Sequence, residues 1–232
     1  MSEHPKSDPD FEKARDLDAP LADKLELFTS ALGVRAPAVS DAYQTLVDNL
    51  GHAKTGATAP AEGDRLPPFV LPNEDGRLVS LAELLSNGPL VISFNRGHWC
   101  PFCWLELLSL GDNLEKVRAA GGDIVSIIPE TAEYSRRVKK QLDLAFGFLT
   151  DLDNAYGLEL GVTMPISAEV KALLEPAGYN LSLYQKNDAW FVPIPAIFVV
   201  GRDGIVKKSH VDVDYRRRFD SDTLPGIIAA LA

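Results

Sequence analysis

Apolar residues recur with two different spacings along the chain, and the change falls near residue 61. Between residues 17 and 60 they return every three or four positions, the spacing typical of amphipathic helices. This predicts one helix that begins at Asp18-Ala19-Pro20 and ends at Gly33, and a second from about Pro37. Residues 1–16 are polar and are predicted to form a disordered tail. The predicted division is a tail at 1–16, a helical extension at 17–60 and a main domain at 61–232.

Short apolar runs alternate with helical patterns in the main domain, which predicts an α/β fold. Because strands separated by helices join through right-handed crossovers, the sheet should be covered on both faces. Residues 163–193 are less regular and are interpreted as an insertion near the functional site. Strands are predicted at 69–71, 78–79, 90–94, 124–128, 148–149, 195–200 and 205–210, and helices at 81–85, 101–120, 131–142, 154–160, 167–175 and 222–231.

Composition and charge narrow the class of protein. Apolar residues make up 46% and charged residues 24% of the chain, proportions that are ordinary for a globular protein. The formal net charge of −10 argues against a nucleic-acid or an anionic-membrane partner. Neither a secretory signal nor an apolar run long enough to span a membrane is visible, so we expect a cytoplasmic protein.

Cys100 and Cys103 are the only cysteines in the chain, and they lie between the predicted strand 90–94 and the helix that begins at Pro101. In the cytoplasm, two close cysteines are more often catalytic or metal-binding than a structural disulfide. A thiol at the start of a helix faces unpaired N–H groups, which can lower its pKa from about 8.5 into the range of about 3.5–7.5. Pro101 fits the first helical position, where its missing N–H has no cost. We therefore predict that Cys100 attacks and Cys103 resolves.

Two other interpretations of this pair remain open. The cysteines could be reduced, buried and merely apolar. They could also bind a metal together with His98, although a closed four-cysteine site lacks its ligands, and we expect no metal and no other cofactor. A redox-active dithiol is the favoured interpretation.

Four segments resemble a known family. Residues 63–69 match a G-x-x-x-P-x-F opening, 149–157 an "SD…YGV" segment and 198–204 an "FIID…G" strand and turn. Residues 94–103 match R-G-x-W-C-P-x-C, the signature that includes Trp99. These segments resemble the peroxiredoxin-like (AhpC/TSA, redoxin) branch of the thioredoxin superfamily, in its CxxC-bearing form. The resemblance implies a thioredoxin-like three-layer sandwich with a central mixed sheet.

The segments depart from the family pattern at two positions. Aligned from Phe94, Cys103 falls on the position of the peroxidatic cysteine, which favours the opposite assignment of the two thiols. Pro195 stands where many peroxiredoxins have an arginine, and Ile194-Pro195-Ala196 resembles the cis-proline segment of thioredoxins. The site thus resembles a peroxiredoxin that carries a thioredoxin-style dithiol.

Nearby charged residues are candidates to support the dithiol. Arg96 could stabilise the thiolate or bind a peroxide oxygen, or it could be an exposed loop residue. Glu106 could orient Arg96 or relay a proton, but a plain structural role is favoured. The run 216–218 contains three adjacent arginines, which the pattern predicts to be a solvated helix start.

The family resemblance implies an antioxidant, thiol-dependent peroxidase that reduces hydrogen peroxide or organic hydroperoxides. Attack on the peroxide gives a sulfenic acid, the second cysteine condenses with it to a disulfide, and a thiol reductant such as thioredoxin or glutathione restores the dithiol. A thiol–disulfide oxidoreductase and a non-catalytic redox sensor are the alternatives. Because the N-terminal helices could pack on a partner subunit, a homodimer is a further expectation.

Overall fold

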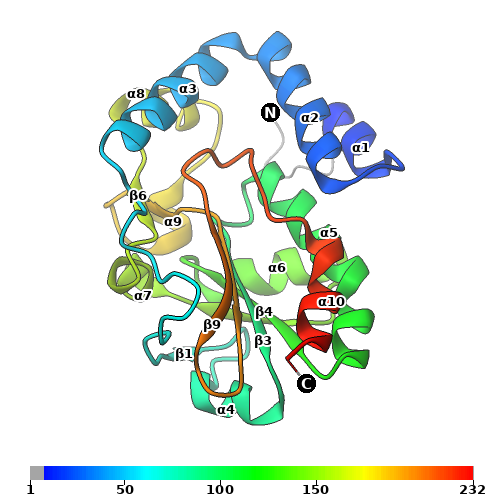
Figure 1. Ribbon diagram of the computed structural model, residues 1–232. Helices are drawn as coiled ribbons and strands as arrows, with labels where there is room; N and C mark the ends of the chain where they lie inside the picture. The colour runs from blue at the N-terminus through cyan, green and yellow to red at the C-terminus, as the bar shows by residue number, and fades with distance from the viewer. Residues whose placement is uncertain (1–7, 232) are drawn as a thin grey trace.

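A five-stranded mixed sheet forms the centre of the computed structural model, which describes residues 8–231 (Figure 1). The strand order is β5-β4-β3-β8-β9; β3, β4 and β5 are parallel, and β8 runs antiparallel to both β3 and β9. All five residues of β3 are buried, as expected for a central strand. The strands are β3 (Leu90–Phe94), β4 (Asp123–Ile128), β5 (Gly147–Thr150), β8 (Ala196–Val200) and β9 (Val206–Val211).

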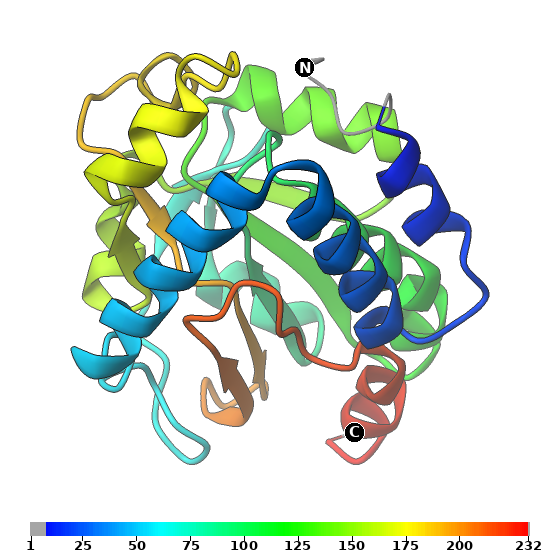
Figure 2. The same ribbon diagram turned by 90° about the horizontal axis from the view of Figure 1, so that it is seen from above.

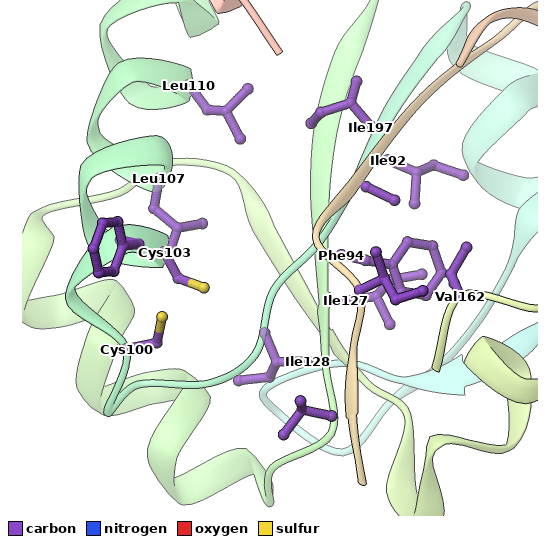
Figure 3. Packing of buried hydrophobic residues seen from close by; sticks show 14 of the residues in the cluster. Ile92, Phe94, Cys100, Cys103, Leu107, Leu110, Ile127, Ile128, Val162 and Ile197 are labelled. Atoms are coloured by element: carbon purple, nitrogen blue, oxygen red, sulfur yellow. The ribbon is translucent and has the colours of Figure 1, made fainter. Parts of the chain in front are cut away.

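Helices cover both faces of this sheet, as the sequence predicts. The crossover helices α5 (Pro101–Ala119) and α6 (Ala132–Leu142) contact each other, and α10 (Leu224–Ala229) packs on α5. On the other face, the ring of Phe94 stacks on Tyr156 of α7 (Ala155–Glu159). Figure 3 shows Phe94 on the side of the strands away from Cys103. The predicted three-layer α/β arrangement is confirmed.

The N-terminal extension consists of three helices rather than two: α1 (Pro9–Asp16), α2 (Leu21–Arg35) and α3 (Pro37–His52). The prediction that the tail is disordered is wrong for 9–16, and residues 1–7 lie outside the described residues. Helix α1 forms because Asp8 caps it by accepting a hydrogen bond from the N–H of Asp10 at 3.0 Å. The buried ring of Phe11 anchors α1 against Phe28 and Trp104.

Helices α2 and α3 lie across the end of the sheet where β3 finishes (Figures 1 and 2). Helix α2 contacts α5 through the rings of Phe28 and Phe102, whose centroids are 5.1 Å apart. Helix α3 contacts α8 (Ala168–Leu174), which belongs to the predicted insertion. The extension therefore packs on its own main domain and brings the insertion over the start of α5.

The remaining elements are short. The predicted insertion begins with β6 and ends with β7, and these two strands pair antiparallel. Strands β1 and β2 form a separate hairpin. Within residues 8–231, no helix has the length and apolar character to cross a membrane. These elements are β1 (Val70–Pro72), β2 (Leu78–Ser80), α4 (Leu81–Asn87), η2 (Leu152–Asn154), β6 (Thr163–Pro165), α9 (Leu181–Gln185), β7 (Phe191–Pro193) and η3 (Ser221–Thr223).

Candidate active site

The dithiol lies at the N-terminus of α5. Cys100 is the N-cap residue in an extended conformation, Pro101 is the first helical residue, and Cys103 lies within the first turn. The N–H groups of Cys103 and Trp104 both donate to the carbonyl oxygen of Cys100, at 3.1 and 3.2 Å. The two sulfur atoms face each other across this turn (Figure 3). Both cysteines are free and buried, and the side chain of Cys100 is 1% exposed.

The loop between β3 and Cys100 is held by Glu130, a residue that the sequence analysis missed. The carboxylate of Glu130 accepts hydrogen bonds from the backbone N–H of His98 at 2.7 Å and pairs with its Nδ1 at 2.8 Å. A Cβ atom on Gly97 would lie 2.5 Å from Oε1 of Glu130, and Gly97 has a φ of +138°. Glycine is therefore required where the loop approaches Glu130. Among residues 8–231, no cluster of His, Cys, Asp and Glu is arranged to hold a metal ion.

Arg96 points into the protein and is enclosed by aromatic rings. Its guanidinium carbon lies 5.1 Å from the ring centroid of Tyr43, 4.9 Å from that of Trp99 and 4.6 Å from that of Tyr215. Its Nη2 donates a hydrogen bond to the hydroxyl of Tyr43 at 2.8 Å, whereas its Nε has no hydrogen-bond partner among the described residues. The alternative of an exposed loop arginine is excluded, since Arg96 is 1% exposed.

A second buried arginine, Arg218, contacts the dithiol from the far end of the chain. Its Nη2 donates to Sγ of Cys103 at 3.5 Å, and its Nη1 forms an ion pair with Glu106. The prediction of a solvated arginine run is wrong for this residue: its side chain is 1% exposed, whereas that of Arg217 is 72% exposed. Glu106 therefore pairs with Arg218 and not with Arg96. The run itself was visible in the sequence, but nothing local marked which arginine turns inward.

The environments of the two thiols separate their pKa values. Burial opposes ionisation of Cys100, but the hydrogen bond from Cys103 and the charges of Arg96 and Arg218 outweigh it and lower the pKa of Cys100 to about 6. Burial raises the pKa of Cys103 well above its usual value, and its hydrogen bond to the Cys100 sulfur raises it further. Of the two thiols, Cys100 thus has the lower pKa.

Glu106 has an unusual protonation equilibrium. Burial raises its pKa to about 7, with the positive charge of Arg218 offsetting only part of the effect. Near neutral pH this carboxyl group can therefore gain or lose a proton beside the guanidinium that contacts Cys103.

Pro195 lies in the sheet region next to β3. It is buried directly before Ala196, which pairs with Phe94 in the sheet. Residues 8–231 contain no cis peptide bond, so the bond before Pro195, which the sequence left open, is trans. Trp99 and Cys100 both line a cavity of about 90 Å³.

The prediction that residues 163–193 lie near the site is confirmed by this cavity. Leu173, Leu174, Ala177 and Tyr179 of the insertion line the same cavity as Cys100. Of the residues singled out in the sequence, the structure brings Arg96, Trp99, Pro101, Cys100 and Cys103 together around the first turn of α5, with Glu106 one turn further on.

A mixed sheet with a helix that begins at a cysteine pair defines a peroxiredoxin-like protein of thioredoxin fold. The chain belongs to the AhpC/TSA family, whose sequence profile matches residues 62–209. It is 32% identical to the chloroplastic peroxiredoxin Q of Sedum lineare over 101 residues, which is 44% of this chain and 54% of the relative. It is 33% identical to peroxiredoxin Bcp of Escherichia coli K12 over 101 residues, 43% of this chain and 64% of the relative.

The chain thus spans between about half and two thirds of the length of these relatives. Among solved structures, peroxidoxin BcpB of Mycobacterium tuberculosis superposes with a TM-score of 0.58 at 18% identity, covering 75% of this chain and 99% of that one. A peroxiredoxin-like protein of Aquifex aeolicus gives a TM-score of 0.58 at 14% identity, covering 75% and 91%. These likenesses establish the fold.

Proposed function

We propose that the protein is a thiol-dependent peroxidase that reduces hydrogen peroxide or organic hydroperoxides through Cys100 and Cys103. The observation that carries the proposal is a cysteine whose pKa is lowered to about 6, at a helix N-terminus beside two buried arginines. A thiolate is the nucleophile that peroxide oxidation requires. The peroxiredoxin names of the relatives support the same activity.

In the first step, the Cys100 thiolate attacks the terminal oxygen of the hydroperoxide. A sulfur–oxygen bond forms, the oxygen–oxygen bond breaks, and Cys100 becomes a sulfenic acid, a two-electron oxidation of the sulfur. The other oxygen leaves as alkoxide or hydroxide and takes up a proton to become alcohol or water. Arg96 is placed to stabilise this developing negative charge, because it lines the same cavity as Cys100 and its charge acts on that thiol.

In the second step, Cys103 attacks the sulfur of the sulfenic acid. A disulfide forms, water leaves, and no further oxidant is needed. Once Cys100 is uncharged it no longer holds up the pKa of Cys103, while Arg218 still stabilises a thiolate there. The charge of Arg218 thus favours ionisation of Cys103 at the moment when this thiol must attack.

A thiol–disulfide oxidoreductase is the second candidate, favoured by the CxxC spacing at the start of α5. Burial of both sulfur atoms weighs against it, because a protein disulfide must reach the attacking thiol. As the reductant that restores the dithiol we propose a thiol such as thioredoxin or glutathione, and as its location the cytoplasm, where such reductants keep thiols reduced. Assembly into a homodimer is also a proposal.

Stopped-flow oxidation of the reduced protein tests the peroxidase. Hydrogen peroxide should oxidise the wild type far faster than free cysteine, and Cys103→Ser should still form a sulfenic acid that a dimedone-type probe traps. Cys100→Ser should lose this fast phase. A wild-type rate equal to that of free cysteine would sink the peroxidase in favour of the oxidoreductase, and fast oxidation of Cys100→Ser would reverse the roles of the thiols.

A further inference from the structure

Tyr43 brings a hydroxyl group from the N-terminal extension into the candidate active site. It belongs to α3, outside the residues 62–209 that match the family profile. Its side chain is buried, and its hydroxyl accepts a hydrogen bond from Nη2 of Arg96 at 2.8 Å. The two residues are 53 positions apart in the sequence. The extension therefore contacts the surroundings of the dithiol directly through this hydroxyl.

Arg96 connects Tyr43 to both cysteines. Its backbone N–H donates a hydrogen bond to Sγ of Cys103 at 3.4 Å. Burial opposes ionisation of Cys100, but the hydrogen bond from Cys103 and the charge of Arg96 lower its pKa. Because a Coulomb interaction weakens with distance, the position of the guanidinium decides how strongly its charge acts on that thiol.

The guanidinium of Arg96 has few polar partners to fix its position. Among the described residues it makes one hydrogen bond, that to Tyr43, and its buried Nε makes none. The rings of Tyr43, Trp99 and Tyr215 enclose it, but the face of a ring attracts a cation without setting the direction of its N–H groups. The hydroxyl of Tyr43 is therefore the group that orients the guanidinium.

We propose that Tyr43 is a positioning residue of the active site, which holds the Arg96 guanidinium where its charge stabilises the Cys100 thiolate. This inference rests on the proposed peroxidase function and places part of its machinery in the N-terminal extension. Burial raises the pKa of Tyr43, so its hydroxyl is neutral and accepts the hydrogen bond near neutral pH. Without that hydroxyl the buried guanidinium would lack a polar partner there and should turn toward solvent, away from the dithiol.

Two tyrosine hydroxyls provide a variant and its control. Tyr43→Phe keeps the ring against Arg96 and removes only the hydroxyl. Tyr156→Phe removes a hydroxyl that is equally well paired, since Tyr156 donates to the carbonyl oxygen of Pro67 at 2.7 Å. The two tyrosines are 5% and 4% exposed, so each variant loses one hydrogen bond of a buried side chain. Effects of lost stability alone should therefore be alike in both.

Alkylation of Cys100 by iodoacetamide at varied pH measures the effect on the thiolate. In Tyr43→Phe the pH midpoint should rise by about one unit, because an opposite charge moves away from the ionised sulfur. The alkylation rate at pH 6 should then fall about fivefold with the thiolate fraction. Tyr156→Phe should keep the wild-type midpoint. An unchanged or lower midpoint in Tyr43→Phe, or an equal rise in Tyr156→Phe, would overturn the proposal.

A double-mutant cycle tests whether Tyr43 acts through Arg96. Arg96→Met should raise the alkylation midpoint of Cys100 further than Tyr43→Phe does, because it removes the charge altogether. Adding Tyr43→Phe to Arg96→Met should then leave the midpoint where Arg96→Met alone puts it, since two residues that act through one contact are not additive. Additive shifts would mean that Tyr43 acts on the thiol by another route and would overturn the proposal.

The same measurements separate this inference from the proposed function, because alkylation needs no peroxide. A wild type that hydrogen peroxide oxidises no faster than free cysteine would refute the peroxidase, while a raised midpoint in Tyr43→Phe would still support the positioning of Arg96. Stopped-flow oxidation of Tyr43→Phe should be about tenfold slower than that of the wild type, since the displaced charge also stabilises the leaving oxygen. A fast peroxidase whose rate and midpoint ignore Tyr43→Phe would refute the positioning role alone.

Discussion

Arg218 donates a hydrogen bond to the sulfur of Cys103 at 3.5 Å although 115 positions separate the two residues in the sequence. The contact brings a positive charge from the C-terminal segment to the first turn of α5. The same guanidinium is paired with Glu106 and donates from Nε to the carbonyl oxygen of Tyr215 at 2.7 Å. Its position is therefore fixed from several sides, which allows it to act on the dithiol as a constant charge.

Replacement of this arginine should affect both stability and thiol chemistry. Arg218→Met leaves the carboxyl group of Glu106 buried without its partner and should lower the free energy of unfolding by about 3–5 kcal/mol. The pKa of Cys100 should also rise, because the charge of Arg218 is one of the causes that lower it. Urea denaturation and thiol alkylation measure the two effects. Arg217→Met is the control, and equal behaviour of the two variants would contradict this role.

The lowered pKa of Cys100 predicts how its reactivity depends on pH. Alkylation by iodoacetamide requires the thiolate, so the rate should rise with pH through a midpoint at about 6 and then level off. In Cys103→Ala the midpoint should move upward, because the hydrogen bond from the second thiol is lost. Mass spectrometry of the alkylated peptide assigns the rate to Cys100. A wild-type midpoint near the ordinary value of about 8.5 would contradict the proposed environment.

The same lowered pKa makes stability depend on pH. The folded protein holds Cys100 as a thiolate above a pH of about 6, whereas in an unfolded chain this thiol keeps its proton up to the ordinary pKa of about 8.5. Between these values the unfolded state binds more protons, so stability rises with pH by up to about 1.4 kcal/mol per pH unit and is lost as pH falls to 6. The free energy of unfolding, measured against Cys100→Ser, should show this slope; parallel curves would refute it.

Gly97 is predicted to be intolerant of any side chain. Gly97→Ala would place a Cβ atom 2.5 Å from Oε1 of Glu130 at a φ of +138°. The strain should cost about 1–3 kcal/mol of stability and slow the reaction of Cys100, because the loop before that residue shifts. Gly226→Ala is the control, since a Cβ there meets no atom within 4 Å. Thermal melting and stopped-flow oxidation check both variants, and an unaffected Gly97→Ala would show that the loop adapts.

Features with a short-range cause were predicted from the sequence. The apolar run Leu90–Phe94 forms β3. Pro101 is the first residue of α5 and Cys100 is the N-cap residue, because the fixed φ and missing N–H of proline favour the first helical position. The periodic patterns in the N-terminal extension also form helices where expected. Helix α1 was missed because the polar sequence around Phe11 offers little periodicity, and its anchor is tertiary.

The sequence alone determined the α/β order of elements and the placement of a cysteine pair where a strand meets a helix, because both depend on neighbouring residues. Only the tertiary structure decided that Arg218 and not Arg217 is buried, that Glu130 holds the loop, and that Tyr43 encloses Arg96. These contacts join residues far apart in the chain, and their energies depend on burial and distance rather than on local spacing. The difference between the two thiols also depends on tertiary contacts, because burial and the charges of the nearby Arg96 and the distant Arg218 act on their pKa values.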